Sequence, residues 1–501
     1  MATTDTGNVS DKPELDQLEK GVGSDGEDAI APTEAEKAAY IRKLDWHLMP
    51  VIFLIYMLSV LDRSNLGNAH VAGLDEGIGL VGNQYNMLGT VFYIGYIVSM
   101  WTVVGWKHFP AHIWCACVVL GWSALSSLQA SVQNYAGLVA IRFILGVFEA
   151  MYAGVPVYLS FFYPKNNVGF RQGIFISGSA LANAYGGALG SAILLIKSKV
   201  PSWRILFLIE GLPTMLMTIV AFFMLPDSIR EARFLTQREK DIAAYCVSEG
   251  QVADTEEGQH TGVRLKELLA GLRDWRSFVT GIIYFGCNVP LASPDFMADH
   301  IRPQVSFASL PLFVPTIIAE IGVFSTIQSN GLSAPPYLFC FFVILAINFT
   351  ADKLHIRGPF ISAFALIAAV GFILLATTTA PVPRYLGVYL AIMIFVCVSL
   401  MMGWVSNMHS TESKRSGGWT VFQTLGQCGP LLGTNVFPAS EKPFYIKGSW
   451  ISTAFCLLVA VMSAGLSLSL WKENKRLDRM FDENLETETD ARASRGFRYI
   501  V

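Results

Sequence analysis

The sequence predicts an all-α membrane protein of about twelve transmembrane helices in two six-helix halves. The chain of 501 residues is 52% hydrophobic and only 15% charged, and its mean hydropathy of +0.45 is too high for a soluble protein of this size. Apolar windows of about 20 residues, the length that crosses a bilayer core, recur along the chain. A charged middle segment separates six such windows from six more, which is the arrangement expected of two repeated halves.

The first segment, residues 1–44, is polar and rich in acidic residues. It is predicted to be a disordered cytosolic tail, because such a composition buries too little apolar surface to fold. A basic stretch followed by a short apolar run does not occur there, so a cleaved signal peptide is not expected.

The N-terminal six-helix half is predicted over residues 45–226 and the C-terminal half over residues 277–471. A cytosolic loop, residues 227–276, joins them, and residues 472–501 form a cytosolic C-terminal tail. The predicted spans lie near 48–66, 85–106, 112–130, 136–159, 173–196, 204–225, 277–323 with an interruption, 327–350, 359–380, 385–407, 418–437 and 449–471.

The orientation follows from the distribution of lysine and arginine. These residues gather before the first predicted span, in the middle loop and after the last span. Because cytosolic segments carry an excess of such residues, both termini and the middle loop are predicted to be cytosolic. The tail carries no recognised retention signal, so the plasma membrane is the expected location.

The composition also excludes several classes of function. A formal net charge of −3 provides no basic field for nucleic acid, which is therefore not an expected partner. Cys115 and Cys117 have no nearby histidine or second cysteine pair to complete a metal site, so no metal is expected. We find no nucleophile with a matching base, so the chain is not expected to be an enzyme, and no cofactor is expected.

The first pair of candidate functional residues, Asp62 and Arg63, lies at the outer end of the first predicted span. A charge inside a membrane span costs at least ~2.5–3.5 kcal/mol on insertion scales, so such residues are functional candidates. Adjacent side chains on a helix point about 100° apart, and each is therefore expected to meet a different helix. The alternative is a pair at the membrane interface that reaches water.

The fourth predicted span carries the second pair, Arg142 and Glu149. A separation of seven residues is about two turns, so the two side chains share one helix face, which is expected to line a polar cavity. An arginine can hold a carboxylate through two hydrogen bonds, and a neighbouring carboxyl group can exchange its proton for the charge of a substrate. The alternative is that both residues only tie helices together.

Two further polar residues are weaker candidates. Glu210 lies in the sixth predicted span and Asn407 at the end of the tenth. For Glu210 the alternative to a functional role is a structural one. Asn407 either hydrogen-bonds a substrate or joins neighbouring helices.

Several motifs resemble the anion:cation symporter family of the major facilitator superfamily. They are residues 61–69 (LDRSNLGNA), 142–150 (RFILGVFEA), 203–213 (WRILFLIEGLP) and 225–227 (LPD). The likeness extends from Lys43 to about Arg479. Within the family, residues 80–86 and 384–389 are similar to those of the fungal allantoate and nicotinic acid permeases, especially the nicotinic acid type.

Residues 351–359 (ADKLHIRGP) are similar to a cytosolic loop signature of the superfamily. The resemblance therefore implies that Asp352, Lys353 and Arg357 form a gating loop. It also implies a major facilitator fold, in which a substrate anion enters a central cavity between the two halves.

The matching positions in galactonate and vesicular glutamate relatives serve proton coupling and anion binding. The resemblance thus assigns substrate binding to Arg63 and Arg142, to which we add Asn407, and proton coupling to Asp62 and Glu149. The expected function is secondary active transport, with proton-coupled uptake of a small organic anion such as nicotinate or another carboxylate. The expected partners are that anion, a proton and the lipid bilayer. The alternatives are an exporter of an acidic secondary metabolite and a non-transporting nutrient sensor.

Two segments depart from the family pattern. Residues 99–108 (SMWTVVGWKH) replace the usual end of the second helix and the basic loop after it, which leaves the first-half gating loop undefined. Residues 294–309 (PDFMADHIRPQVSFAS) interrupt the seventh span. This insert is either a real outer or re-entrant segment or an intron retained in the gene model, and its flanks would join into one apolar helix without it.

Overall fold

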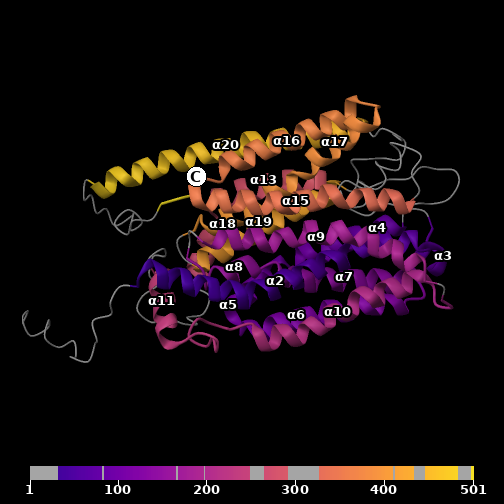
Figure 1. The fold of residues 1–501 in the computed structure, drawn as a ribbon, viewed down its shortest axis with the longest axis horizontal. Coiled ribbons are helices and arrows are strands. Elements are labelled where there is room, and N and C mark those ends of the chain that lie inside the picture. The colour runs from indigo at the N-terminus through magenta and orange to yellow at the C-terminus, as the bar shows by residue number, and fades with distance from the viewer. Residues whose placement is uncertain are drawn as a thin grey trace, which may run out of the picture.

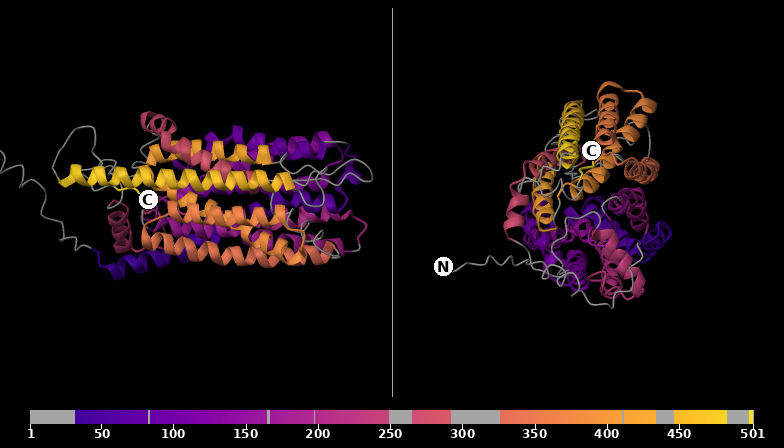
Figure 2. Two further views of the ribbon diagram at one scale, coloured as in Figure 1. Left: turned by 90° about the horizontal axis from the view of Figure 1, so that it is seen from above. Right: turned by 90° about the vertical axis from the view of Figure 1, so that its left-hand side faces the viewer.

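The computed structural model describes residues 32–81, 84–164, 167–196, 198–248, 265–291, 326–409, 412–433, 446–482 and 498–500. Within these residues all regular structure is helical. Eight of the helices in the described part of the chain are long and apolar enough to cross a membrane, or nine if one bent pair counts as a single span. The long helices lie side by side in one elongated bundle (Figures 1 and 2). These features confirm the predicted all-α membrane fold.

Six long helices build the N-terminal half of the bundle. Helix α2 packs against α9 and α10, α6 packs against α7 and α10, and α4 packs against α7. Their bounds are α2 Glu34–Val71, α4 Gln84–Val98, α6 Ala111–Leu128, α7 Tyr135–Tyr152, α9 Val168–Leu194 and α10 Ser202–Met224. Shorter helices extend or connect them, namely α3 Leu74–Ile78, η1 Met100–Val104, α5 Gly105–His108, η2 Gln129–Ser131 and α8 Val155–Leu159.

The C-terminal half repeats this arrangement. Helix α16 packs against α17 and α20, and α13 packs against α19 and α20. The bounds are α13 Trp275–Leu291, α15 Thr326–Leu354, α16 Gly358–Thr377, α17 Pro381–Ile392, α18 Ile394–Ser406, α19 Glu412–Gly433 and α20 Ile446–Asp482. The insert at residues 294–309 lies outside the described residues, and both of its explanations stay open.

The two ends of the bundle differ. Helix α2 starts and α20 finishes at the same end, which we call the tail-side end, whereas α3 lies at the opposite end (Figure 1). The middle segment folds into α11 (Gln237–Ser248) and α12 (Leu265–Leu272), of which α11 packs against α2 and α12 against α19. The halves contact each other through α9 with α15 and α18, and through α4 with α19.

One predicted boundary is wrong, because residues 34–44 are helical and not part of a disordered tail. Thr33 and Glu36 form a capping box that satisfies free backbone groups at the start of α2. Tyr40 is buried and donates a hydrogen bond of 2.8 Å to the Phe162 carbonyl. The capping box and the buried contacts made by Tyr40 and Leu44 hold this segment as the first turns of a 38-residue helix.

The second span also differs from a single straight helix. Helix α4 ends at Val98, and the chain continues through the 3₁₀ turn η1 and the short helix α5, bent by 45°. This break coincides with residues 99–108, the segment that departs from the family pattern.

The end of the chain packs against the C-terminal half. Trp404 of α18 is fully buried and donates its indole N–H to the carbonyl of Ile500 at 2.8 Å. Asn474 of α20 makes two hydrogen bonds of 2.8 Å with the backbone of Tyr499, and the Arg276 guanidinium lies 4.8 Å from the Tyr499 ring centre. The predicted C-terminal tail therefore includes a segment fixed to the bundle.

Candidate substrate and proton site

The centre of the candidate site is an ion pair between α2 and α7. The Arg63 guanidinium donates two hydrogen bonds to one Glu149 oxygen, at 2.6 and 3.0 Å. The Glu149 side chain is 1% exposed, whereas the Arg63 side chain retains 25% exposure. Arg63 also lies over the rings of Phe92 and Tyr96 on α4, 5.5 and 5.2 Å from their centres. The pair is thus held by three helices, with its cation as the more accessible partner.

Asp62 faces away from this pair, as expected from the angle between adjacent helical side chains. Its carboxylate accepts hydrogen bonds from Ser126 of α6 at 2.9 Å and from Thr214 of α10 at 3.2 Å. Asp62 is fully buried, and α2 continues for nine residues beyond it to Val71. At 1.5 Å per residue this is about 14 Å of helix. The burial of Asp62 favours contacts with other helices over a pair that reaches water.

Arg142 is fully buried on the same face of α7 as Glu149. None of its three guanidinium nitrogens has a hydrogen-bond partner among the described residues. It interacts electrostatically with Tyr85, Glu149 and Asp62. A buried cation without a hydrogen-bonded anion is costly. Because the Arg142 N–H donors have no partner among the described residues, they are available to bind a carboxylate.

The C-terminal half contributes Tyr284 of α13. Its ring stacks on Phe422 of α19, with the ring centres 4.5 Å apart. The Tyr284 side chain interacts electrostatically with Arg63 and Tyr96 in the other half. The Arg63–Glu149 pair therefore faces the boundary between the halves, where a transported molecule would have to bind.

Tyr284 is not among the site residues predicted from the sequence. A usable signal was present, because Thr280, Tyr284 and Asn288 recur every four residues and so share one face of the seventh span. Asn288 is buried and donates a hydrogen bond of 2.9 Å to the Gly426 carbonyl of α19.

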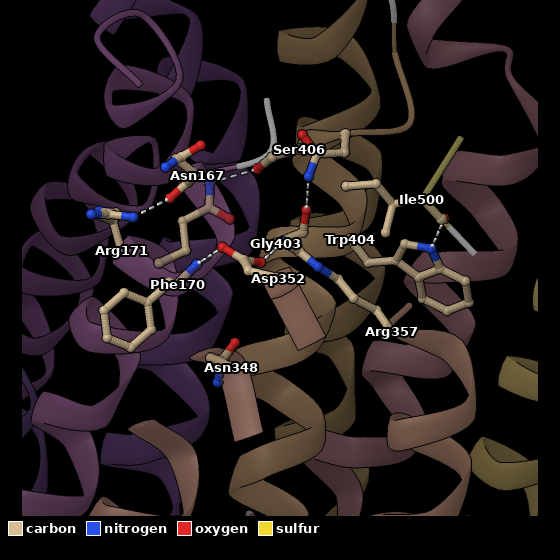
Figure 3. A network of polar contacts seen from close by, with 12 residues as sticks. Asn167, Phe170, Arg171, Asn348, Asp352, Arg357, Gly403, Trp404, Ser406 and Ile500 are labelled. Atoms are coloured by element: carbon tan, nitrogen blue, oxygen red, sulfur yellow. Dashed lines mark hydrogen bonds and ion pairs between the residues drawn. The ribbon is translucent and has the colours of Figure 1, made fainter. Parts of the chain in front are cut away.

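The predicted gating loop lies at the tail-side end and joins the two halves (Figure 3). The Asp352 carboxylate accepts a hydrogen bond of 2.6 Å from the Phe170 backbone N–H at the start of α9, and it pairs with Arg357. Arg357 is buried between Gly169 of α9 and Gly403 of α18, and a Cβ at either glycine would overlap its guanidinium group. Lys353 is exposed, so only Asp352 and Arg357 contribute to this contact.

Further hydrogen bonds close the tail-side end between the halves. Gln172 of α9 donates to Ser406 of α18 at 2.8 Å, and Lys107 of α5 donates to Ser413 of α19 at 3.0 Å. The Trp419 indole N–H donates to the Ala153 carbonyl at 2.9 Å. The segment that departs from the family pattern thus contributes a lysine contact to the closed end.

Asn407 occupies a different region from the charged groups. It caps the end of α18 next to Ser406, and its amide donates to the Gly403 carbonyl of its own helix at 3.1 Å. The structure thus places it beside the tail-side contact. A role in substrate binding stays a prediction for this residue.

A two-half bundle of membrane-spanning helices, with buried ionisable groups at its centre and contacts between the halves at one end, defines a membrane transporter. Residues 52–434 match the family model described as Major Facilitator Superfamily. The chain belongs to this superfamily, and it is a transporter and not an enzyme.

Individual relatives agree with this assignment. Major facilitator-type transporter hxnP of Emericella nidulans is 30% identical over 461 residues, which cover 89% of this chain and 88% of that protein. The high-affinity nicotinic acid transporter of Saccharomyces cerevisiae is 26% identical, with coverage of 92% and 83%. Among solved structures, the proton:xylose symporter XylE superimposes with a TM-score of 0.64 at 16% identity, covering 87% of this chain and 96% of its own.

Proposed function

We propose that this transporter takes up a small organic anion, such as nicotinate or another carboxylate, together with a proton. The observation that carries the proposal is the Arg63–Glu149 pair, in which a partly accessible guanidinium is occupied by a buried carboxylate. A substrate carboxylate and Glu149 would compete for the same donors. Protonation of Glu149 removes one competitor, so the proton and the anion bind together.

Arg142 supplies a second cation close to this pair. Its guanidinium is buried without a hydrogen-bonded partner among the described residues. It can therefore hold the carboxylate of a substrate that has displaced Glu149. In this scheme Glu149 is the proton acceptor, and Asp62 provides negative charge beside Arg142.

The tail-side contact supplies the gate for alternating access. The cross-half hydrogen bonds of Asp352, Gln172 and Lys107 hold this end closed. Opening it requires that these bonds break while the halves rock about the central site. Before this step Glu149 is protonated and the bound anion is paired with arginine. No unpaired charge is then carried through the membrane.

The driving force is limited by the charge that moves. One proton with one monoanion transfers no net charge, so only the pH gradient contributes. A gradient of two pH units supplies ~2.8 kcal/mol, which allows about 100-fold accumulation.

We also propose that the tail-side end faces the cytosol and that the protein resides in the plasma membrane. Lysine and arginine gather on the segments at this end, before α2 and in the middle loop. The structure would then represent a state closed toward the cytosol.

The deciding experiment is uptake of radiolabelled nicotinate and a panel of small carboxylates into transporter-deficient cells at acidic and neutral pH. The name of the S. cerevisiae relative supports testing nicotinate first. Acid-stimulated uptake that is lost in Glu149→Gln and in Arg142→Ala supports the proposal, and Glu231→Gln, at an exposed position outside the spans, serves as the control. If intact protein at the cell surface takes up none of these acids, the proposal is wrong and export or nutrient sensing replaces it.

A further inference from the structure

The last helix of the chain continues past the rest of the bundle. Helix α20 lies at the edge of the bundle and extends beyond the other long helices at the tail-side end (Figures 1 and 2). Its apolar sequence ends at Leu470 and Trp471, and the charged residues 472–482, which we call the α20 extension, follow. The extension is therefore the part of α20 that leaves the hydrocarbon core of the membrane.

The exposed face of α20 changes from apolar to basic along one line. Val461 and Leu468 are 71% and 60% exposed, so in a membrane they contact lipid chains. Exposed cations follow on the extension, namely Lys472, Lys475 and Arg479. They come four, seven and eleven residues after Leu468, so at 100° per residue they lie within about 40° of it around the helix axis. These three cations, which we call the basic stripe, thus continue the lipid-facing surface.

The depth of the basic stripe is fixed by a contact with α16. A Cβ added at Gly358, the first residue of α16, would lie 2.6 Å from the Ser467 Cβ, so the two residues are at one level. Along the axis Lys472 lies about 8 Å and Arg479 about 18 Å beyond Ser467. Lysine and arginine side chains reach several ångströms back toward the membrane. The stripe is therefore within reach of the lipid headgroups.

The neighbours of the basic stripe do not neutralise it. The Lys475 ammonium lies 3.8 Å from the centre of the Trp471 ring, and tryptophan favours the interface between membrane and water. The described acidic side chains of the extension pair with other cations. Asp478 accepts a hydrogen bond from Arg498 at 2.5 Å, and Glu473 lies 3.9 Å from Arg476. The stripe consequently presents positive charge next to the lipid chains.

We propose that the basic stripe, with Trp471, binds the headgroups of anionic phospholipids in the leaflet at the tail-side end. A cation close to an anionic membrane surface contributes about fivefold in affinity. A general excess of cations at this end would set the orientation of the chain without being aligned with lipid-facing residues, whereas a lipid site requires the alignment. The inference goes beyond the proposed function and depends on it only for which leaflet is cytosolic.

The test measures lipid binding to the purified full-length protein in detergent. The protein is titrated with phosphatidylserine or phosphatidylcholine, and native mass spectrometry reports the bound lipid. The unmodified protein should bind phosphatidylserine about tenfold or more tightly than phosphatidylcholine. Replacing all three cations of the stripe with glutamine should abolish this preference, whereas Lys472→Arg with Lys475→Arg should keep it, because the charge is retained.

A matched control removes the same charge elsewhere at this end. Arg233→Gln, Lys266→Gln and Arg273→Gln together change three exposed cations outside α20, and this variant should keep the preference. Soluble glycerophosphoserine, which has the headgroup without the chains, should not displace the lipid at equal concentration.

Three results would overturn the inference. They are an unchanged preference in the glutamine variant of the stripe, an equal loss in the control variant, and displacement of the lipid by glycerophosphoserine. The second would assign the preference to overall charge, and the third to a site for any small anion. None of these measurements uses transport, so a failure of the proposed function leaves them unaffected.

Discussion

The proposed gate at the tail-side end allows a quantitative prediction for Asp352→Asn. The Asp352 carboxylate accepts the Phe170 N–H across the halves at 2.6 Å, and this bond exists only while the end is closed. A hydrogen bond to a charged group contributes ~1.5–3 kcal/mol. Because 1.4 kcal/mol corresponds to a tenfold change, the ratio of closed to open protein should fall by about 10- to 150-fold.

The assay is the rate at which a soluble maleimide labels a cysteine at position 406. Ser406 is 1% exposed and lies in the closed contact, so Ser406→Cys reacts only when the end opens. Cys117, which is exposed, is replaced by serine in every variant, and the protein is purified in detergent. Asp352→Asn should raise the labelling rate about 10-fold or more, following the open population.

A matched control is the exposed neighbour, Lys353→Gln, which should leave the rate unchanged. Gly169→Ala should act like Asp352→Asn, because the added Cβ would overlap the Arg357 guanidinium between the halves. If Ser406→Cys is labelled at the same rate with and without Asp352→Asn, in protein that remains folded, this contact does not stabilise the closed end.

Three more perturbations have expected outcomes. Arg63→Ala leaves the Glu149 carboxylate buried without its cation, so thermal unfolding in detergent should show a loss of ~3–5 kcal/mol, larger than the loss in Glu149→Gln. Trp404→Phe keeps an aromatic ring but removes the donor to Ile500, which should cost about 1 kcal/mol and increase hydrogen exchange at the C-terminus. Burial holds the pKa of His409 below its usual value of 6.5. At pH values between the folded and unfolded pKa of this histidine, the unfolded chain binds more protons than the folded protein. The free energy of unfolding should therefore fall as the pH drops below 6.5, by at most ~1.4 kcal/mol per pH unit. His409→Gln should reduce this loss.

Each of these outcomes can be contradicted. A Glu149→Gln protein less stable than Arg63→Ala would mean that the cation is the costlier buried partner. Unchanged exchange in Trp404→Phe, alongside a chain lacking residues 498–501 that is also unchanged, would show that the C-terminal contact contributes nothing. An acid-induced loss of stability of the same size in His409→Gln and in the unmodified protein would assign that loss to other groups.

The sequence by itself determined the class of fold. Hydropathy windows and the charged middle segment predicted two sets of spans, because a bilayer imposes the same length and apolar composition on every helix that crosses it. The same constraint made Asp62, Arg63, Arg142 and Glu149 stand out, since ionisable residues are rare where they are expensive. The family motifs added the expected gating loop at residues 351–359.

The boundaries of the helices depend on local hydrogen bonds, which a hydropathy profile does not contain. The capping box at Thr33 extends α2 well before its apolar window, and the bend after Val98 interrupts a segment that reads as continuous. Asp62 lies well inside α2 because the helix continues to Val71 with residues that are not uniformly apolar. Local hydrogen bonding, and not hydropathy, sets these limits.

Only the tertiary structure decided which charges meet. The pattern placed Arg142 and Glu149 on one face, but the bundle pairs Glu149 with Arg63 and leaves the Arg142 guanidinium without a hydrogen-bond partner among the described residues. It also joins Asp62 of α2 to Thr214 of α10 by a hydrogen bond and brings Tyr284 of the other half within electrostatic reach of Arg63. These contacts join residues far apart in the chain, and they depend on how helices rotate and cross when small residues such as Gly146 let the backbones approach.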